Sequence, residues 1–238
     1  MSNAVYISLG RQAGLAQELS MVANNLANSS TTGYKTDRAI FSEYIQASGN
    51  EDPSISMGWL SAHTYELSQG AVQATGNTYD LALQGDGFFA VETDRGVRLT
   101  RAGHFQQDPA GRLTDAQGNT VLGAGGNQIT IPDNASLITI GADGSISADG
   151  QLIDRVGVFE TEGDLVRDAD TLFEPLAGYA PFEAGQMIQG ALEQSNVSPV
   201  EEIARMIAVQ RAYEAGQSMM EREDQRITQL ITTLRNNT

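Results

Sequence analysis

Two histidines and an aspartate-rich segment are the residues best suited to metal or acid–base chemistry. His63 and His104 lie far apart in the sequence, so a two-histidine metal site would need carboxylates from other segments. We expect both histidines at ordinary surface or edge positions. The segment DADTLFEP, residues 168–175, begins like a calcium loop but has Phe173 where the sharp-turn glycine belongs. Neither feature predicts a metal site.

The glycine-rich run LGAGGNQ raises the question of a nucleotide site. It has Gly123 and Gly125, but Gln128 occupies the third glycine position and no βαβ unit follows. No nucleophile elbow, P-loop or HExxH motif occurs. With 30 acidic residues, pairs of carboxylates are expected by chance and a solvated surface is the default. We therefore predict no catalytic residue, no metal ligand and no cofactor, and a protein that is not an enzyme.

Composition narrows the possible partners. The chain has 238 residues and a net charge of −16, which repels phosphate backbones and anionic membranes. No nucleic-acid partner and no membrane insertion are expected, since no apolar run approaches the ~20 residues of a membrane span. The first residues show no cleavable secretory signal. Cysteine is absent, which excludes disulfides and thiolate metal sites, and 25 glycines indicate turns and β-structure.

The elements that organise the chain begin with a helix over residues 4–28. Its seam has the alternating steps of a heptad and consists of Val5, Leu9, Gln12, Ala16, Leu19, Ala23 and Leu26. Asparagine, serine and threonine side chains compete for backbone hydrogen bonds, so residues 28–33 should end this helix. Gly33 is suited to a positive φ there.

The last forty residues predict the second helix. Ser198 to Glu201 form a capping box, with Pro199 at the first helical position. A seam follows at Ile203, Met206, Gln210, Tyr213, Gln217, Met220, Asp224, Ile227, Ile231 and Leu234. A second stripe contains Ala204, Ala208, Ala212, Ala215 and Met219, and Ile207, Val209 and Leu230 widen the apolar arc. One partner helix cannot cover both stripes.

Between the helices, residues 71–176 alternate short apolar runs with glycine-rich turns, which predicts a compact antiparallel β-domain. The fold class is therefore α+β: paired, coiled-coil-like terminal helices and a central antiparallel β-rich domain. We place the helical domain at 1–35 with 190–238, a linker or extension at 36–70, and the β-rich domain at 71–189.

Three separated segments resemble one family. ANNLANSSTTGYKTDR, residues 23–38, is similar to the N-terminal motif of axial proteins of the bacterial flagellar rod and hook. Residues 190–220, GALEQSNVSPVEEIARMIAVQRAYEAGQSMM, resemble their C-terminal motif, and residues 69–105 resemble their first β-domain. Ser29-Ser30 stands where Val-Asn is frequent, and Tyr34 where Phe is frequent. The resemblance covers nearly the whole chain in the right order.

The resemblance implies an inner domain of paired terminal helices and an outer β-domain. Many copies, with other rod proteins, would stack helically into the hollow, periplasm-spanning shaft of the basal body, which transmits torque and forms part of the export channel. It also implies export through the flagellar type III apparatus without a cleaved signal. The length most resembles proximal-rod members; the alternative is a distal-rod or hook-type paralogue. The rival class, an extracellular carbohydrate-active or calcium-dependent enzyme, needs a cluster of acids that the sequence does not show.

Subunit assembly is expected to use the helical seams and the asparagines beside them. We expect Asn24, Asn25 and Asn28 to end the first helix and also to hydrogen-bond across subunits, as Asn196 does before the second helix. The predicted assembly interface contains Leu9, Ala16, Leu19, Asn24, Asn25, Leu26, Asn28, Asn196, Ile203, Met206, Ile207, Ala208, Gln210, Ala212, Tyr213, Gln217, Met220, Ile227, Ile231 and Leu234.

Overall fold

A computed structural model describes residues 2–46, 55–133 and 135–236. The chain divides into two compact units, and each is described by itself. Unit 1 contains residues 1–27, 37–66 and 198–238, and unit 2 contains residues 28–36 and 67–197. Segments from both ends of the chain therefore meet in unit 1, while unit 2 is formed mainly by the middle.

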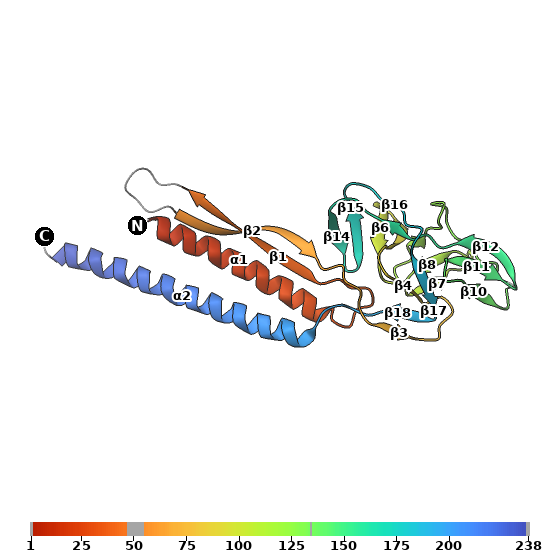
Figure 1. Cartoon of the computed structure of the whole chain (residues 1–238). Helices are drawn as coiled ribbons and strands as arrows, with labels where there is room; N and C mark the ends of the chain where they lie inside the picture. Colours follow the sequence, from red (N-terminus) through yellow and green to blue (C-terminus); the bar gives the residue numbers. More distant parts are fainter. Residues whose placement is uncertain (1, 47–54, 134, 237–238) are drawn as a thin grey trace. The chain divides into compact units, whose positions relative to one another are not determined.

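Unit 1 consists of two helices and a β-hairpin. Helix α1 spans Ser2–Ala27 and helix α2 spans Pro199–Asn236; Figure 1 draws them alongside each other, α1 in red and α2 in blue. Strands β1 (Asp37–Gln46) and β2 (Ile55–Tyr65) pair antiparallel, with an irregularity in register between Ile40 and Phe41. Both predicted helices are present: α1 begins two residues earlier and ends one residue earlier than predicted, α2 begins at Pro199 as predicted, and Gly33 has a φ of 70°.

The segment predicted as a linker or extension, residues 36–70, contains the β-hairpin. The structure places two strands there and groups residues 37–66 with the helices. Its apolar residues do not alternate strictly, because Ala39, Ile40 and Phe41 are consecutive. The irregularity at this point lets the strand change phase, which hides the period-two pattern.

Unit 2 is an antiparallel β-structure. Its strands are β3 (Val72–Ala74), β4 (Leu81–Gln84), β5 (Phe89–Thr93), β6 (Gly96–Thr100), β7 (Phe105–Gln107), β8 (Leu113–Asp115), β9 (Thr120–Val121), β10 (Ile138–Ile140), β11 (Ser145–Ala148), β12 (Gln151–Arg155), β13 (Phe159–Glu160), β14 (Leu165–Ala169), β15 (Leu172–Pro175), β16 (Ala180–Pro181), β17 (Gln186–Gln189) and β18 (Ala191–Glu193). A seven-stranded sheet has the order β14-β15-β6-β5-β9-β8-β7, and β10-β11-β12 form a three-stranded sheet. The pairs β13-β16, β17-β4 and β18-β3 complete the described set.

The core of unit 2 is aliphatic with a few aromatic rings. Phe89 and Phe105 meet edge to face with their centroids 5.1 Å apart, surrounded by buried leucine, isoleucine and valine side chains from β4, β5, β8, β9 and β11. The α+β class and the antiparallel β-rich centre predicted from the sequence are therefore confirmed. Within the described ranges, neither helix carries an apolar run long enough to cross a bilayer.

A buried ionic cluster joins three segments of unit 2. The Lys35 ammonium lies 2.6 Å from Glu193 Oε1, and Arg101 Nη1 lies 3.2 Å from Glu193 Oε2. All three side chains are almost fully buried. Lys35 also donates to the carbonyl of Ser68, and the Gly70 amide donates to Glu193. Burial lowers the pKa of the Arg101 guanidinium, while Glu193 opposes that change. The cluster fixes residue 35, residues 68–70 and β18 to one another.

Candidate assembly surface

Polar contacts hold α1 against α2. Arg205 donates from both Nε and Nη2 to Glu18 Oε1, at 3.1 and 3.0 Å. Nearer the other end, Gln12 Nε2 donates to the backbone carbonyl of Tyr213 at 2.9 Å. Both contacts join residues far apart in the sequence, so they fix the helices side by side with a defined register.

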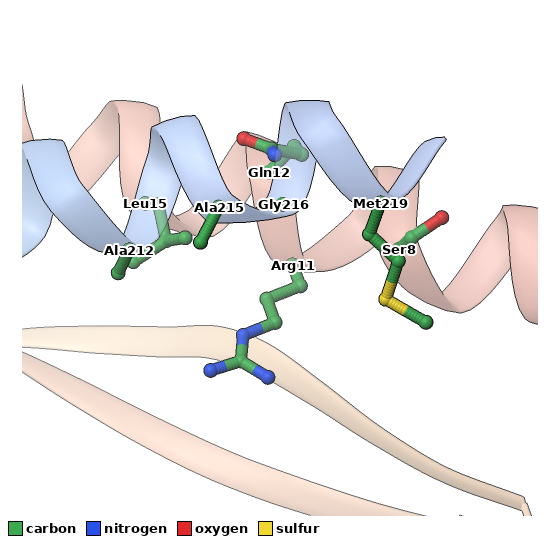
Figure 2. Close-up of a pocket in the computed structure, with 8 residues that line it drawn as sticks. All are labelled: Ser8, Arg11, Gln12, Leu15, Ala212, Ala215, Gly216 and Met219. Carbon is green, nitrogen blue, oxygen red and sulfur yellow. The ribbon is translucent and has the colours of Figure 1, made fainter. Parts of the chain in front are cut away.

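Beside the second contact, the two helices leave a groove between them. It has a cavity volume of about 220 Å³ and is lined by Ser8, Arg11, Gln12, Leu15, Ala212, Ala215, Gly216 and Met219. Figure 2 shows the side chains of Leu15, Ala212 and Met219 along it, with the Arg11 guanidinium extending away from the helices. Small residues on α2 open the groove, because a larger side chain at position 212 or 215 would fill it. Gln12 is 6% exposed, and its buried Oε1 has no hydrogen-bond partner among the described residues.

Gly216 allows the close approach of Gln12 to α2. A Cβ at position 216 would lie 2.2 Å from Gln12 Nε2, so Gly216→Ala forces the amide away from the Tyr213 carbonyl. Losing that hydrogen bond costs about 1 kcal/mol, which offsets the gain of about 1 kcal/mol in helix propensity. We expect an unfolding free energy close to wild type for Gly216→Ala alone. In a Gln12→Ala background the same change should stabilise the protein by about 1 kcal/mol.

Chemical denaturation of all four proteins, followed by circular dichroism at the helix band, measures this coupling. If Gly216→Ala changed the free energy of unfolding equally in the wild-type and Gln12→Ala backgrounds, the close approach of Gln12 to Gly216 would be contradicted.

Apolar side chains remain exposed along α2. Ile203 and Ile207 are 47% and 46% exposed, and near the end of the helix Leu234 is 71% exposed. Val200, Met219 and Ile231 are also exposed, as is Leu9 on α1. Val209, which widens the apolar arc, is 6% exposed and so belongs to the packed side of α2. Several large apolar side chains of α2 are therefore about half exposed or more in the described chain.

The twenty residues of the predicted assembly interface divide by exposure. The exposed members are Leu9, Ala16, Asn24, Ile203, Ile207, Ala208, Gln210, Gln217, Ile231 and Leu234. The half-buried members are Leu19, Leu26, Asn28, Asn196, Met206, Ala212, Tyr213, Met220 and Ile227, and Asn25 is the buried one. Assembly through these residues stays a prediction. Sequence reasoning missed Arg11, Leu15 and Gly216 as groove residues, although each lies next to a seam position or the alanine stripe.

Asn25 has contacts within its own chain that the sequence did not predict. It is 1% exposed; its Oδ1 accepts from the Asp37 backbone amide at 3.0 Å, and its Nδ2 donates to the Asp37 carbonyl at 2.9 Å. The same Nδ2 lies 3.3 Å from Glu202 Oε2. One amide therefore joins the end of α1 to the start of β1 and the first turn of α2.

Asn196 has the corresponding role in unit 2. Its Oδ1 accepts from the backbone amide and the hydroxyl of Thr36, both at 2.8 Å. Its Nδ2 donates to the carbonyl of Ser68 at 3.1 Å. Both asparagines thus make hydrogen bonds that fix the chain's own connecting segments, which suits the polar residues found beside the helix ends.

The residues considered for metal or acid–base chemistry each have ordinary polar partners in their own unit. His63 lies 3.3 Å from Asp37 in unit 1, and His104 lies 2.8 Å from Asp80 in unit 2; both side chains are about half exposed. Asp168, in the calcium-like segment, pairs with Arg95 and Arg98. Across residues 2–46, 55–133 and 135–236, no three histidine or carboxylate groups cluster in a way that would hold a metal ion.

Comparison with known proteins gives three family matches in chain order. Residues 6–35 match the family described as "Flagella basal body rod protein". Residues 82–148 match "Flagellar hook protein FlgE/F/G D1 domain", and residues 188–233 match "Flagellar basal body rod FlgEFG protein C-terminal". The first and last matches include most of α1 and α2, and the middle one lies in unit 2.

Individual relatives match over nearly their whole length. The chain is 38% identical to a flagellar basal-body rod protein FlgF of Caulobacter vibrioides, over 93% of each chain. It is 32% identical to the FlgF of Mesorhizobium japonicum, over 98% of each. A flagellar basal-body rod protein FlgG of Bacillus subtilis is 28% identical, over 99% of this chain and 100% of the relative.

Proposed function

This chain belongs to the family of flagellar basal-body rod proteins, and from that premise we propose that it is a structural subunit of the proximal rod, of the FlgF type. The observation that carries the proposal is similarity to FlgF proteins along almost the entire chain, at up to 38% identity. A distal-rod subunit is the second candidate, because a FlgG protein also matches over the full length.

The surface of the helices supports an assembling role. Burying an apolar side chain contributes roughly 1.5–3 kcal/mol, and Ile203, Ile207 and Leu234 are exposed in the single chain. Neighbouring copies and other rod proteins cover them in the shaft. In that setting α1 and α2 act as a coiled-coil-like inner domain and unit 2 as an outer domain. Repeated, non-closing contacts then extend the subunits into a helical tube that transmits torque and surrounds the export channel.

The same proposal includes the export route of the protein and a purely structural role. The protein reaches the rod through the flagellar export apparatus without removal of a signal segment. Its contribution is mechanical rather than enzymatic, with no cofactor and no membrane-inserted part. The two half-exposed histidines and their aspartate neighbours act as ordinary polar contacts of their units.

Deleting the gene from its host and restoring it in trans tests this proposal. We expect the deletion strain to lack swimming motility and complete rods, and the restored strain to recover both. Mass spectrometry of purified basal bodies should find the intact chain in the rod fraction. A deletion strain with normal motility and normal rods would contradict the proposal. Cryo-electron microscopy of those basal bodies separates a proximal from a distal position along the shaft.

A further inference from the structure

Helix α2 carries two unlike surfaces on opposite sides. One surface is the groove described above, lined on α2 by Ala212, Ala215, Gly216 and Met219. The other, the lateral stripe, consists of the exposed residues Ile203, Ile207, Gln210 and Glu214. Stripe residues follow one another at steps of four, three and four, so they share one line along the helix.

The angular separation of the two surfaces follows from helix geometry. Each residue turns the helix by about 100°, which places the centre of the lateral stripe about 160° from the centre of the groove residues. The positions between them that face α1 include Val209 and Tyr213, which are buried and half-buried. The groove and the stripe therefore lie on opposite flanks of the α1–α2 pair.

The two surfaces are complementary in chemistry. The groove contains Leu15 and Met219 for an aliphatic side chain, and its volume of about 220 Å³ exceeds what one isoleucine side chain requires. At its edge, Arg11 is exposed and forms no ion pair with any part of the chain that the structure describes. In the stripe, Glu214 is likewise exposed and unpaired within the described segments. Charge complementarity thus favours a partner that presents the stripe.

Gln12 supplies a further reason for an occupant. Its Oε1 is buried beside the groove and has no donor among the described residues. Leaving such an acceptor unsatisfied costs about 1–3 kcal/mol. The stripe carries an amide donor, Gln210, between its two isoleucines and Glu214. An occupant of this composition offers an apolar group, a donor and an anion in one line.

We propose that the groove receives the lateral stripe of a second copy of this chain, with Ile207 in the groove and Glu214 beside Arg11. This proposal rests on the proposed rod function and names its partner surface. Because groove and stripe are different surfaces on opposite flanks, the contact is heterologous and each copy leaves one of each free. The same contact therefore repeats from copy to copy and does not close a dimer.

Disulfide trapping tests the contact directly, because the natural chain has no cysteine. Ile207→Cys and Ala215→Cys are introduced together, and basal bodies are purified and mildly oxidised. Residues 207 and 215 are eight positions apart on one helix, a rise of about 12 Å, which is too far for an intramolecular bond because a disulfide needs Cα atoms within about 7 Å. We expect a ladder of dimers and larger species, and none from either single variant. Leu152→Cys with Ala215→Cys is the matched control, because residue 152 is exposed in unit 2.

Charge exchange gives an independent readout. Arg11→Glu and Glu214→Arg should each lower the amount of the chain in purified basal bodies about fivefold, and the double variant should restore it to within about twofold. A cross-linked ladder with restoration supports the proposal. The proposal is overturned if the cysteine variant is present in rods in a normal amount but gives no ladder, and the double charge variant does not recover the amount lost in the single variants. In that case the proposed rod function still stands. Absence of the wild-type chain from rods would overturn both.

A photo-cross-linking amino acid at Met219 examines the identity of the partner. Capture of a second copy supports the proposal, and exclusive capture of a different rod protein would overturn the self-contact.

Discussion

Glu193→Gln is expected to lower the free energy of unfolding of unit 2 by about 3–5 kcal/mol. Glutamine keeps the shape of glutamate and can still accept hydrogen bonds, but it removes the negative charge that two buried cations share. The Lys35 ammonium at 2.6 Å and the Arg101 guanidinium at 3.2 Å would then both lose the carboxylate between them. Burying unpaired charge is far more costly than losing one neutral hydrogen bond.

Lys35→Met is the matched control for this effect. It removes one cation and leaves Arg101 and Glu193 as a buried pair of opposite charge. Its cost should be less than about half that of Glu193→Gln, although both changes break the same ion pair. If the two variants lost equal stability, the cluster would be acting through packing rather than through charge.

Hydrogen exchange of the full chain, followed by mass spectrometry, provides the measurement. Peptides covering β18 and residues 33–36 should lose protection in Glu193→Gln, because Glu193 also accepts the Gly33 amide through its backbone carbonyl. Peptides from the two helices report on unit 1 in the same experiment and show whether the change stays within unit 2.

How far the sequence predicts this fold depends on how local each signal is. Both helices follow from heptad spacing, and their ends follow from Pro199 and from the asparagine and glycine residues after Ala27. Those signals lie within a few residues of the features they determine. The β-rich centre follows from turn glycines in the same way, whereas strand order does not, because pairing joins distant segments.

The β-hairpin and the ionic cluster were not predictable by these means. The hairpin's apolar residues lose their alternation at Ile40 and Phe41. The cluster joins Lys35, Arg101 and Glu193, three residues that no local pattern connects. Charged residues are usually solvated, so composition alone placed them on the surface. Their burial is evident only from the three-dimensional structure, in which the three side chains lie next to one another.

The groove between the helices was partly predictable from the sequence. Its alanine stripe was evident from spacing, but the stripe's partner was not, because Arg11, Leu15 and Gly216 lie one position away from the seams that were identified. Helix seams mark the line of closest contact, and a groove forms beside that line. An assembly surface can therefore include residues adjacent to a seam as well as the seam itself.

Asn25→Leu is expected to loosen the junction of α1, β1 and α2 by about 2–4 kcal/mol and to abolish rod assembly. Leucine has nearly the shape of asparagine but cannot replace the two hydrogen bonds to the Asp37 backbone or the contact with Glu202. The loss leaves polar groups of Asp37 and the buried Glu202 carboxylate with fewer partners. Asn24→Leu, at the exposed neighbouring position, is the control and should cost less than half as much stability as Asn25→Leu.

Two readouts separate an intramolecular role for Asn25 from the predicted contact across subunits. In the purified full chain, hydrogen exchange at residues 20–27 and 37–40 should increase clearly more in Asn25→Leu than in Asn24→Leu. Motility and the amount of chain in basal bodies are measured in parallel. If the Asn25 side chain orders its own chain, Asn25→Leu should lose both hydrogen-exchange protection and assembly, because a misplaced α1 cannot present its seam to a neighbouring subunit. Wild-type protection combined with failed assembly would instead assign the amide to a neighbouring subunit, because the single chain would then not need it.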